Sequence, residues 1–545
     1  MRTRGSSSGR ALKLSLLLAG LAGVVAILSS LRPAAADHLC PATGSPFGPF
    51  NIETYEALDY RNTYARTMEL ASYNALFPEQ PSFALPGLES GGRSAGSGQI
   101  VNPYIPPVLL KAIAWLESGW AQASYDPLVQ YGEVGPVLAS HDCGYGIMQV
   151  TSGMQNVSGV PNLEQAMIGG HYAFNVARGA RILAEKWNAG PDYRPLVGAR
   201  NPYLIEDWYY ALWVYNGFAF KNHPLNPDYS SARVPFSCGP DGDGYGHDRS
   251  QYPYQELVMG CAARPALRAG SQLWSPQEVH LPNLSDPQFA GPLSIANWDP
   301  CVYELNCAPM DMPTPNTNHQ DPTALTVERS QVIGTPAFGF SQGQFGFAAA
   351  PGQQVSAQLT VSNSGSGLLA WKAVSSAPWL WISRAQDVAL APDLGERPSL
   401  LTLNVNTTSL PPGDSVATIT FESLYASGAP ATVQVTVSIS GTPAPTLPAG
   451  ARIWGDADCG GTPTIGDSQK TARALIGLAV SQEPGCPGIG APVTVDGVPR
   501  VWGDVVCGGG ASIGDAQKLA RALIGLPPVQ AEGCPAVGQV VALAV

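Results

Sequence analysis

The sequence predicts a multidomain protein with an α-helical domain, an all-β sandwich domain and a small α-helical tandem repeat. Apolar residues recur at helical spacing in several segments between residues 100 and 310. Polar and apolar residues alternate along much of 333–441, which is typical of strands. Two near-identical segments beginning at Trp454 and Trp502 form the repeat. The length of 545 residues also argues against a single compact domain.

Residues 1–36 are predicted to be a secretory signal peptide. Basic residues between Arg2 and Lys13 precede an apolar run at 14–31, and Ala34 to Ala36 offer a cleavage site. The run is long enough that an uncleaved membrane anchor remains an alternative. All ten cysteines follow this segment, and an even count in an exported chain predicts disulfides. We therefore expect an extracellular or cell-envelope-associated protein.

Composition excludes one class of partner and supports export. The formal net charge of −12 leaves no basic footprint for nucleic acid. Only 13% of residues are charged, while 60 Gly and 50 Pro fit an extracellular chain with many loops.

Composition also sets the expected domain boundaries. An N-terminal helical segment with a Gly/Ser-rich hinge covers 37–99, and the helical domain with a cysteine-containing extension covers 100–310. Linkers are expected at 311–332 and 442–451, on either side of the sandwich at 333–441, and the repeat fills 452–545. Within the helical part, we expect helices at 54–77, 106–119, 172–189 and 205–218.

Glu117 is the candidate catalytic residue because it lies near the end of a strongly apolar helix. Pro106 and Pro107 suit the first turn of this helix, and Gly119 suits its end. Burial and the negative end of the helix dipole both disfavour the carboxylate and so raise its pKa. A carboxylic acid that stays protonated near neutral pH can act as a general acid.

Four segments resemble, in order, the motifs of soluble lytic transglycosylase catalytic domains, members of the lysozyme-like superfamily. They are AWLESGW, GYGIMQ, NVARGARIL and WVYNGF, within residues 100–230. The resemblance implies a lysozyme-like fold in which Glu117 is the catalytic acid/base and the Tyr215 hydroxyl holds its side chain. It places Asn175, Gly179 and Ala180 in a scaffold helix. It implies a saccharide groove formed by Ser118, Gly144, Tyr145, Gly146, Ile147, Met148, Gln149 and Asn216.

This resemblance implies a secreted peptidoglycan lytic transglycosylase, a carbon–oxygen lyase that needs no cofactor and whose partners are glycan strands. Glu117 protonates the oxygen between N-acetylmuramic acid and N-acetylglucosamine, and the acetamido group of the sugar stabilises the cationic carbon. Deprotonated Glu117 then takes the proton of the muramyl carbon-6 hydroxyl, which closes a 1,6-anhydro ring.

Two alternatives stay open. Asp126, Glu133 or Asp142, which lie in an insertion between the first two motifs, can position a water as in a lysozyme-type muramidase. The alternative from another class is a surface scaffold that binds glycan without cutting it. Cys143, at the edge of the second motif, is expected in a disulfide, with Cys238 and Cys261 as candidate partners.

The sandwich segment resembles BACON-type, immunoglobulin-like domains through LTVSNSGSGLLAWKAVSSAPWLWIS and VNTTSLPPGDSVATITF. The resemblance implies a binding or spacer role. We expect Trp379 and Trp381 to face one side of a strand and belong to the core, with an exposed glycan-stacking surface as the alternative.

The repeat resembles dockerin type I, which implies calcium loops and a cohesin-like protein or cell-surface glycan as a partner. The candidate calcium ligands are Asp456, Asp458, Thr464 and Asp467 in the first copy and Asp504, Ser512 and Asp515 in the second. Val506 and the glycines Gly460 and Gly508 stand where the pattern has oxygen ligands. A metal-free helical pair held by Cys459–Cys486 and Cys507–Cys534 is therefore an equal alternative.

Overall fold

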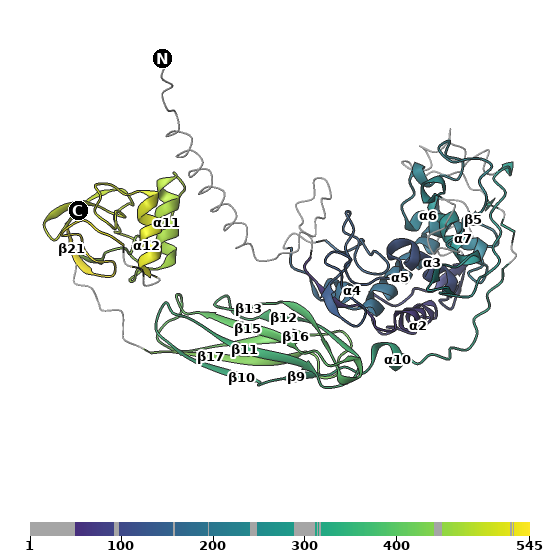
Figure 1. The fold of residues 1–545 in the computed structure, drawn as a ribbon, viewed down its shortest axis with the longest axis horizontal. Helices are drawn as coiled ribbons and strands as arrows, with labels where there is room; N and C mark the ends of the chain where they lie inside the picture. The colour runs from purple at the N-terminus through teal and green to yellow at the C-terminus, as the bar shows by residue number, and fades with distance from the viewer. Residues whose placement is uncertain are drawn as a thin grey trace, which may run out of the picture.

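The computed structural model describes residues 50–544, apart from 92–97, 156–158, 194–195, 240–247, 288–310, 313, 316–317, 441–449, 524–525 and 527. The expected signal peptide, Cys40, Cys301, Cys307 and most of the second linker lie outside the described residues. The described part is a multidomain chain with a helical region followed by a β-rich C-terminal region (Figure 1). No helix in the part of the chain that the structure describes is long and apolar enough to span a bilayer.

The helical region packs its helices around one apolar core. Contacts join α5 with α4 and α6, and α3 with α7 (Figure 1). The α-helices are α2 (Tyr60–Ser72), α3 (Pro107–Ser118), α4 (Leu163–Gly170), α5 (Tyr172–Tyr193), α6 (Tyr209–Tyr215) and α7 (Tyr254–Ala263). Short strand pairs brace the loops: β1 (Glu53–Tyr55) with β4 (Val134–Pro136), β2 (Leu88–Ser90) with β3 (Gln99–Val101), and β6 (Leu267–Arg268) with β7 (Ser271–Gln272).

The helix that carries Glu117 has the limits that its sequence predicts. Pro107 occupies the first turn of α3, and Gly119 caps its end with a φ of 61°, a left-handed conformation that suits glycine. The expected helix at 205–218 is instead a 3-10 turn (Ile205–Trp208) followed by α6. The expected helix at 54–77 is wrong at its start, because Glu53–Tyr55 forms β1 and pairs with the insertion strand β4.

The segment expected as the first linker lies against the helical region. Strand β8 (Asp311–Met312) pairs in parallel with β5 (Leu196–Val197). Thr314 Oγ1 donates to Asp207 at 2.6 Å, and Thr323 N donates to Tyr73 Oη at 3.0 Å. The short helix α10 (Ser330–Ile333) ends the segment, and the carbonyl of Val332 accepts a bond from Tyr172 Oη at 2.7 Å. These contacts fix the path of the chain into the sandwich.

Two sheets, in which most strand pairs are antiparallel, form the sandwich. One has the order β10-β17-β16-β12-β14 and the other β13-β15-β11-β9. Trp371 lies fully buried in the core between them, whereas Trp381 is 43% exposed, so the core expectation for Trp381 is wrong. Trp379 is half-buried beside the same core. The strands are β9 (Phe338–Phe340), β10 (Gln344–Ala349), β11 (Gln354–Asn363), β12 (Leu368–Ser375), β13 (Leu380–Ile382), β14 (Gln386–Leu390), β15 (Ser399–Asn406), β16 (Gly413–Glu422) and β17 (Ala431–Ile439).

The helical region and one end of the sandwich share a continuous apolar core. Tyr425 packs edge-on against Phe174 and His171, at centroid distances of 5.3 Å in both cases. The Gln386 side chain accepts a bond from Glu53 N at 2.7 Å and donates to Glu53 O at 2.9 Å. Complete burial lowers the pKa of His171 to about 3, so this histidine is neutral in the junction.

The C-terminal repeat contains the two predicted helices and a sheet that we did not predict. Helices α11 (Ile465–Leu475) and α12 (Ile513–Leu523) pack together. Strands β18 (Ala451–Ile453), β19 (Pro492–Val495), β20 (Val498–Val501) and β21 (Val540–Ala544) form a sheet in the order β18-β21-β19-β20. An Asp496-Gly497 turn with positive φ at both residues joins β19 to β20, and this dipeptide is a hairpin signal that the sequence analysis missed.

One disulfide cross-links each copy of the repeat, as predicted. Cys459 bonds to Cys486 and Cys507 to Cys534, each across a sequence separation of 27. Closing a loop of this length stabilises the folded chain by about 3.5 kcal/mol on the chain-entropy model. These bonds are compatible with an extracellular protein.

Candidate active site

Glu117 lies in the last turn of α3 beside a tyrosine that the sequence analysis did not identify. The Tyr254 hydroxyl donates a hydrogen bond to Glu117 Oε1. Burial raises the pKa of Glu117 to about 7, while this hydrogen bond and the positive charge of Arg249 oppose the rise. Glu117 therefore keeps its proton to a much higher pH than an ordinary glutamate does.

Tyr254 is the first residue of α7, in the cysteine-containing extension. Its backbone N–H donates to Asn222 Oδ1 at 3.3 Å. The Cys238–Cys261 disulfide, with Cα atoms 4.8 Å apart, ties α7 to the preceding loop. This pairing corrects the expectation that Cys143 bonds to Cys238 or Cys261. Cys143 is itself disulfide-bonded.

Tyr215 does not make the contact with Glu117 that the sequence analysis assigned to it. Its hydroxyl donates to the carbonyl of Met148 at 3.2 Å. Its ring stacks on that of Tyr254, with centroids 6.4 Å apart. Tyr215 thus packs against the tyrosine that bonds to Glu117. Burial and the nearby negative charge of Glu117 both raise the pKa of Tyr215.

Two cavities border Glu117, and we call them together the groove. Their volumes are about 380 and 390 Å³, and Glu117, Ser140 and Gln149 line both. The first extends past Trp115 and Tyr125, and we call it the Trp115 cavity. The second, which we call the Tyr215 cavity, extends past Tyr215 and Asn216. A polymer lying in this groove would cross Glu117.

Most residues of the second motif shape the groove without lining it. The side chains of Tyr145, Ile147 and Met148 lie in the apolar core, so these residues can border the groove only through their backbone. Gly144 and Gly146 are buried backbone positions. A Cβ on Gly146 would lie 2.5 Å from Asn175 Nδ2, so only glycine fits there. Gln149 is the member of this motif that reaches both cavities.

Buried side chains hold this motif against the helices. Asn175 Oδ1 accepts a bond from Met148 N at 2.8 Å, and Asn175 Nδ2 donates to Tyr145 O at 2.7 Å. Ser118 Oγ lies 2.9 Å from the carbonyl of Ile147, which links α3 to the motif. Ser118 is therefore a structural link, although it borders the Trp115 cavity. A Cβ on Gly179 would lie 2.7 Å from Met148 Cβ, so glycine at this position lets α5 pack closely against Met148. The side chain of Ala180, the next residue of α5, is buried.

Of the three candidate second carboxylates, Asp142 alone lies in the groove. It is exposed, lines the Tyr215 cavity with Glu117, and accepts a hydrogen bond from Ser140 Oγ. Its negative charge contributes to the raised pKa of Glu117. Asp126 and Glu133 are exposed and line neither of the two cavities that contain Glu117.

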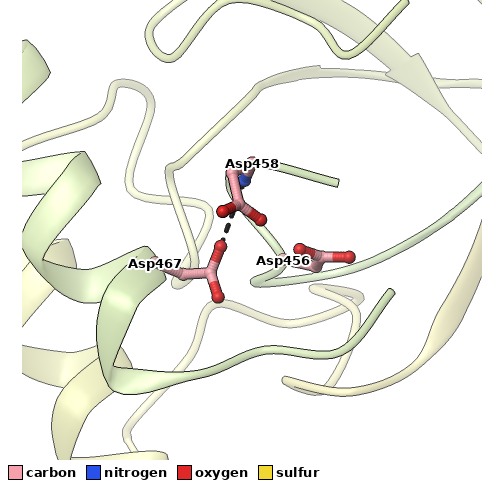
Figure 2. A group of neighbouring side chains, drawn as sticks. All are labelled: Asp456, Asp458 and Asp467. Atoms are coloured by element: carbon pink, nitrogen blue, oxygen red, sulfur yellow. Dashed lines mark hydrogen bonds between the residues drawn. The ribbon is translucent and has the colours of Figure 1, made fainter. Parts of the chain in front are cut away.

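A second constellation lies in the first copy of the C-terminal repeat. Oxygen atoms of Asp456, Asp458 and Asp467 all lie within 4.8 Å of one another (Figure 2). Thr464 bonds to Asp467 through its backbone N–H and its hydroxyl, at 2.7 and 2.8 Å. Lys470 forms an ion pair with Asp458. Converging carboxylates are the donors that a hard divalent cation takes, so this loop fits calcium.

The second copy offers fewer oxygen atoms. Asp504 accepts bonds from the N–H groups of Gly508 and Gly509, both at 2.9 Å. Ser512 donates to Asp515 Oδ2 through its backbone N–H and its hydroxyl. The other oxygen, Asp515 Oδ1, is buried and has no hydrogen-bond partner among the described residues. Val506 brings no oxygen at its position, so this loop fits a cation less well than the first.

Comparison with known proteins identifies the sandwich. The family model for the viral BACON domain matches residues 337–438, so this segment is a BACON-type domain within a longer chain. No curated protein sequence matches the chain.

The solved structures that resemble the chain do so over a small part of it. A Bacteroides ovatus GH5 xyloglucanase in complex with a heptasaccharide is 18% identical, with a TM-score of 0.14 over 22% of each chain. A C. elegans MSP family member is 15% identical, with a TM-score of 0.15 over 19% of this chain and 97% of that one. A putative carbohydrate binding protein from Bacteroides ovatus is 10% identical, with a TM-score of 0.17 over 19% of this chain and 38% of that one. Scores this low carry no argument about function.

Proposed function

We propose that the helical region is the catalytic domain of a secreted peptidoglycan lytic transglycosylase with a lysozyme-like fold. The observation that carries this proposal is a carboxylic acid with a pKa of about 7 that borders two cavities. A glycan strand lying across both cavities would place a glycosidic bond at Glu117. A protein that only binds glycan has no need for a protonated acid there.

The reaction needs Glu117 in both protonation states. The protonated carboxyl gives its proton to the glycosidic oxygen while the bond to the muramyl carbon breaks, and the acetamido group of that sugar stabilises the positive charge. The resulting carboxylate then removes the proton of the carbon-6 hydroxyl, whose oxygen attacks the same carbon and closes the anhydro ring. A pKa near 7 suits a group that serves as acid and then as base. Tyr254 holds the carboxyl in position between these steps.

Hydrolysis by a muramidase mechanism remains the alternative, and Asp142 is the residue on which it depends. Asp142 shares a cavity with Glu117 and can accept a proton from a water. Its exposure favours the lytic proposal, because an exposed carboxylate in contact with solvent is not positioned by burial to activate one particular water.

The experiment digests purified peptidoglycan sacculi and weighs the soluble muropeptides. The lytic proposal expects anhydro products, one water lighter than hydrolytic ones, which disappear with Glu117→Gln. Glu133→Gln is the matched control, because Glu133 is an exposed glutamate that lines neither cavity of the groove and should leave activity unchanged. Reducing ends of full mass would support the muramidase, and intact sacculi would support the scaffold alternative.

We further propose that the C-terminal repeat is a dockerin-like tether whose first loop binds calcium. The three converging carboxylates of that loop support this role, and Asp456, Asp458 and Asp467 would hold the ion. The partner would be a cohesin-like protein or a surface glycan. Calorimetric titration of the chelator-treated protein with Ca²⁺ should show a site that Asp467→Asn weakens at least tenfold. Asp496→Asn, in the hairpin turn of the same module, is the control.

A further inference from the structure

A third cavity of about 340 Å³ lies beside the groove. Glu56, Ala121, Ala123, Tyr125, Leu128, Val129, Gln130, Tyr131 and Arg268 line it. It shares Tyr125 with the Trp115 cavity and no lining residue with the Tyr215 cavity. The third cavity therefore lies next to the Trp115 cavity, on the other side of Tyr125. A linear polymer in the groove that continues past Tyr125 would reach the third cavity.

This cavity is built largely by parts of the chain outside the four motifs. The N-terminal segment supplies Glu56, the insertion supplies Tyr125 and the residues from Leu128 to Tyr131, and the extension supplies Arg268. The rings of Tyr60 and Tyr131 stack at 4.6 Å. The Arg268 guanidinium lies 4.8 Å from the Tyr60 ring centroid and 5.2 Å from that of Trp115. Arg268 thus joins the wall of the Trp115 cavity to the third cavity.

Polar contacts hold this wall in a fixed shape. Arg268 donates to Gly119 O at 2.6 Å and to Tyr131 Oη at 3.1 Å. The Tyr125 hydroxyl donates to the carbonyl of Ser118. The buried Glu56 carboxylate accepts bonds from Gln122 N at 2.9 Å, Ala123 N at 2.8 Å and Tyr64 Oη at 2.7 Å, so its oxygens are occupied within the protein.

The surface that remains for a ligand is aromatic and apolar. Tyr125 is 54% exposed, Tyr131 47% and Leu128 68%. Arg268 bonds to Gly119 and Tyr131. Glu56 accepts bonds from Gln122, Ala123 and Tyr64. Neither of these two charged lining residues is therefore free to bind a ligand. A sugar ring has apolar C–H faces, which can pack on tyrosine rings. Its hydroxyl groups can at the same time stay in water. An N-acetylhexosamine ring has this amphipathic character.

We propose that the third cavity binds a further saccharide unit of the glycan strand, beyond the units on either side of Glu117. This inference rests on the proposed function, since it takes the ligand of the groove to be a glycan. It assigns to the insertion and the extension the selection of long strands over short ones.

The test measures binding with the Glu117→Gln protein, so that no cleavage occurs. Isothermal calorimetry with stem-free N-acetylglucosamine–N-acetylmuramic acid oligosaccharides of increasing length should show affinity rising until the third cavity is filled. Tyr131→Ala and Leu128→Ala should each weaken the longest oligosaccharide about five- to tenfold, as expected for loss of one stacking or apolar contact. Neither should change affinity for the shortest ligand that binds. Leu400→Ala is the control, because Leu400 is a similarly exposed leucine on the sandwich.

The outcomes separate this proposal from the proposed function. Affinity that does not rise with length, or an equal loss at every length, would overturn the third-cavity proposal. Cleavage of sacculi by the wild-type protein, measured separately, tests the proposed function. A protein that cleaves without length-dependent binding retains its catalytic assignment and loses this one. A protein that binds longer oligosaccharides more tightly and does not cleave sacculi keeps the third-cavity assignment and loses the catalytic one. Melting temperatures of the variants show whether any loss reflects unfolding.

Discussion

The Tyr254 hydroxyl donates a hydrogen bond to the carboxyl of Glu117 from a position 137 residues further along the chain. This bond favours the carboxylate and so opposes the rise in pKa that burial causes. The balance of the two effects leaves the acid with a pKa of about 7, where it can give and take a proton.

Tyr254→Phe should raise the pKa of Glu117, because it removes a donor that stabilises the charged form. The loss of activity with rising pH should then move to higher pH by about one unit, since a hydrogen bond to a charged group is worth about 1.5–3 kcal/mol and neighbouring water offsets part of that. We also expect kcat to fall about tenfold, because the carboxyl loses a positioning contact. The measurement is the pH profile of kcat/KM on sacculi. Tyr215→Phe, which removes a bond to Met148 O instead, should leave the profile in place. An unshifted profile for Tyr254→Phe would show that this tyrosine has only a structural role.

Asp142→Asn separates the two reaction types. The lytic mechanism expects anhydro products to persist, with kcat reduced less than about tenfold. Asp142 raises the pKa of Glu117, so its loss should move the pH profile slightly toward acid. Mass spectrometry of the products and the pH profile check both points. A loss of three orders of magnitude would instead identify Asp142 as the base of a hydrolase.

Glu117→Gln should make the protein more stable at alkaline pH. The folded-state pKa of Glu117 is raised from 4.5 to about 7, so between these values the folded state holds a proton that the unfolded state has released. Stability from this group therefore falls as pH rises from 4.5 to 7. Thermal unfolding should give wild type and Glu117→Gln similar melting temperatures near pH 4, and the variant should melt several degrees higher at pH 8. Glu133→Gln should track wild type at both pH values.

Tyr425→Ala tests the continuous core between the sandwich and the helical region. The substitution removes a ring that packs on His171 and Phe174 and a hydroxyl that accepts a bond from Ala370 N at 3.0 Å. We expect a loss of about 3–5 kcal/mol from the free energy of unfolding. Calorimetry should show that unfolding of the two parts separates into distinct transitions. A single transition at the wild-type temperature would mean that the junction contributes little.

Local patterns in the sequence determined the features that depend on near neighbours. Pro107, the apolar stripe and Gly119 set the limits of α3 and hence the place of Glu117 at its end, because capping and helical periodicity act within a few residues. Equal cysteine spacing in the two copies was enough to predict Cys459–Cys486 and Cys507–Cys534. The alternating pattern at 333–441 predicted the sandwich. The Asp496-Gly497 hairpin was also readable from sequence and was missed.

Only the tertiary structure decided which distant side chains meet at Glu117. Tyr254 approaches because α7 packs on α3, and no local pattern encodes that contact. Asp142 lies in the groove while Asp126 and Glu133 lie outside it, a distinction set by the path of the insertion loop and its pairing through β4 with β1. Contacts of this kind depend on how loops close over long sequence separations, and residue type and spacing carry little information about that. The sequence therefore placed Glu117 at the end of α3, and the fold supplied its neighbours.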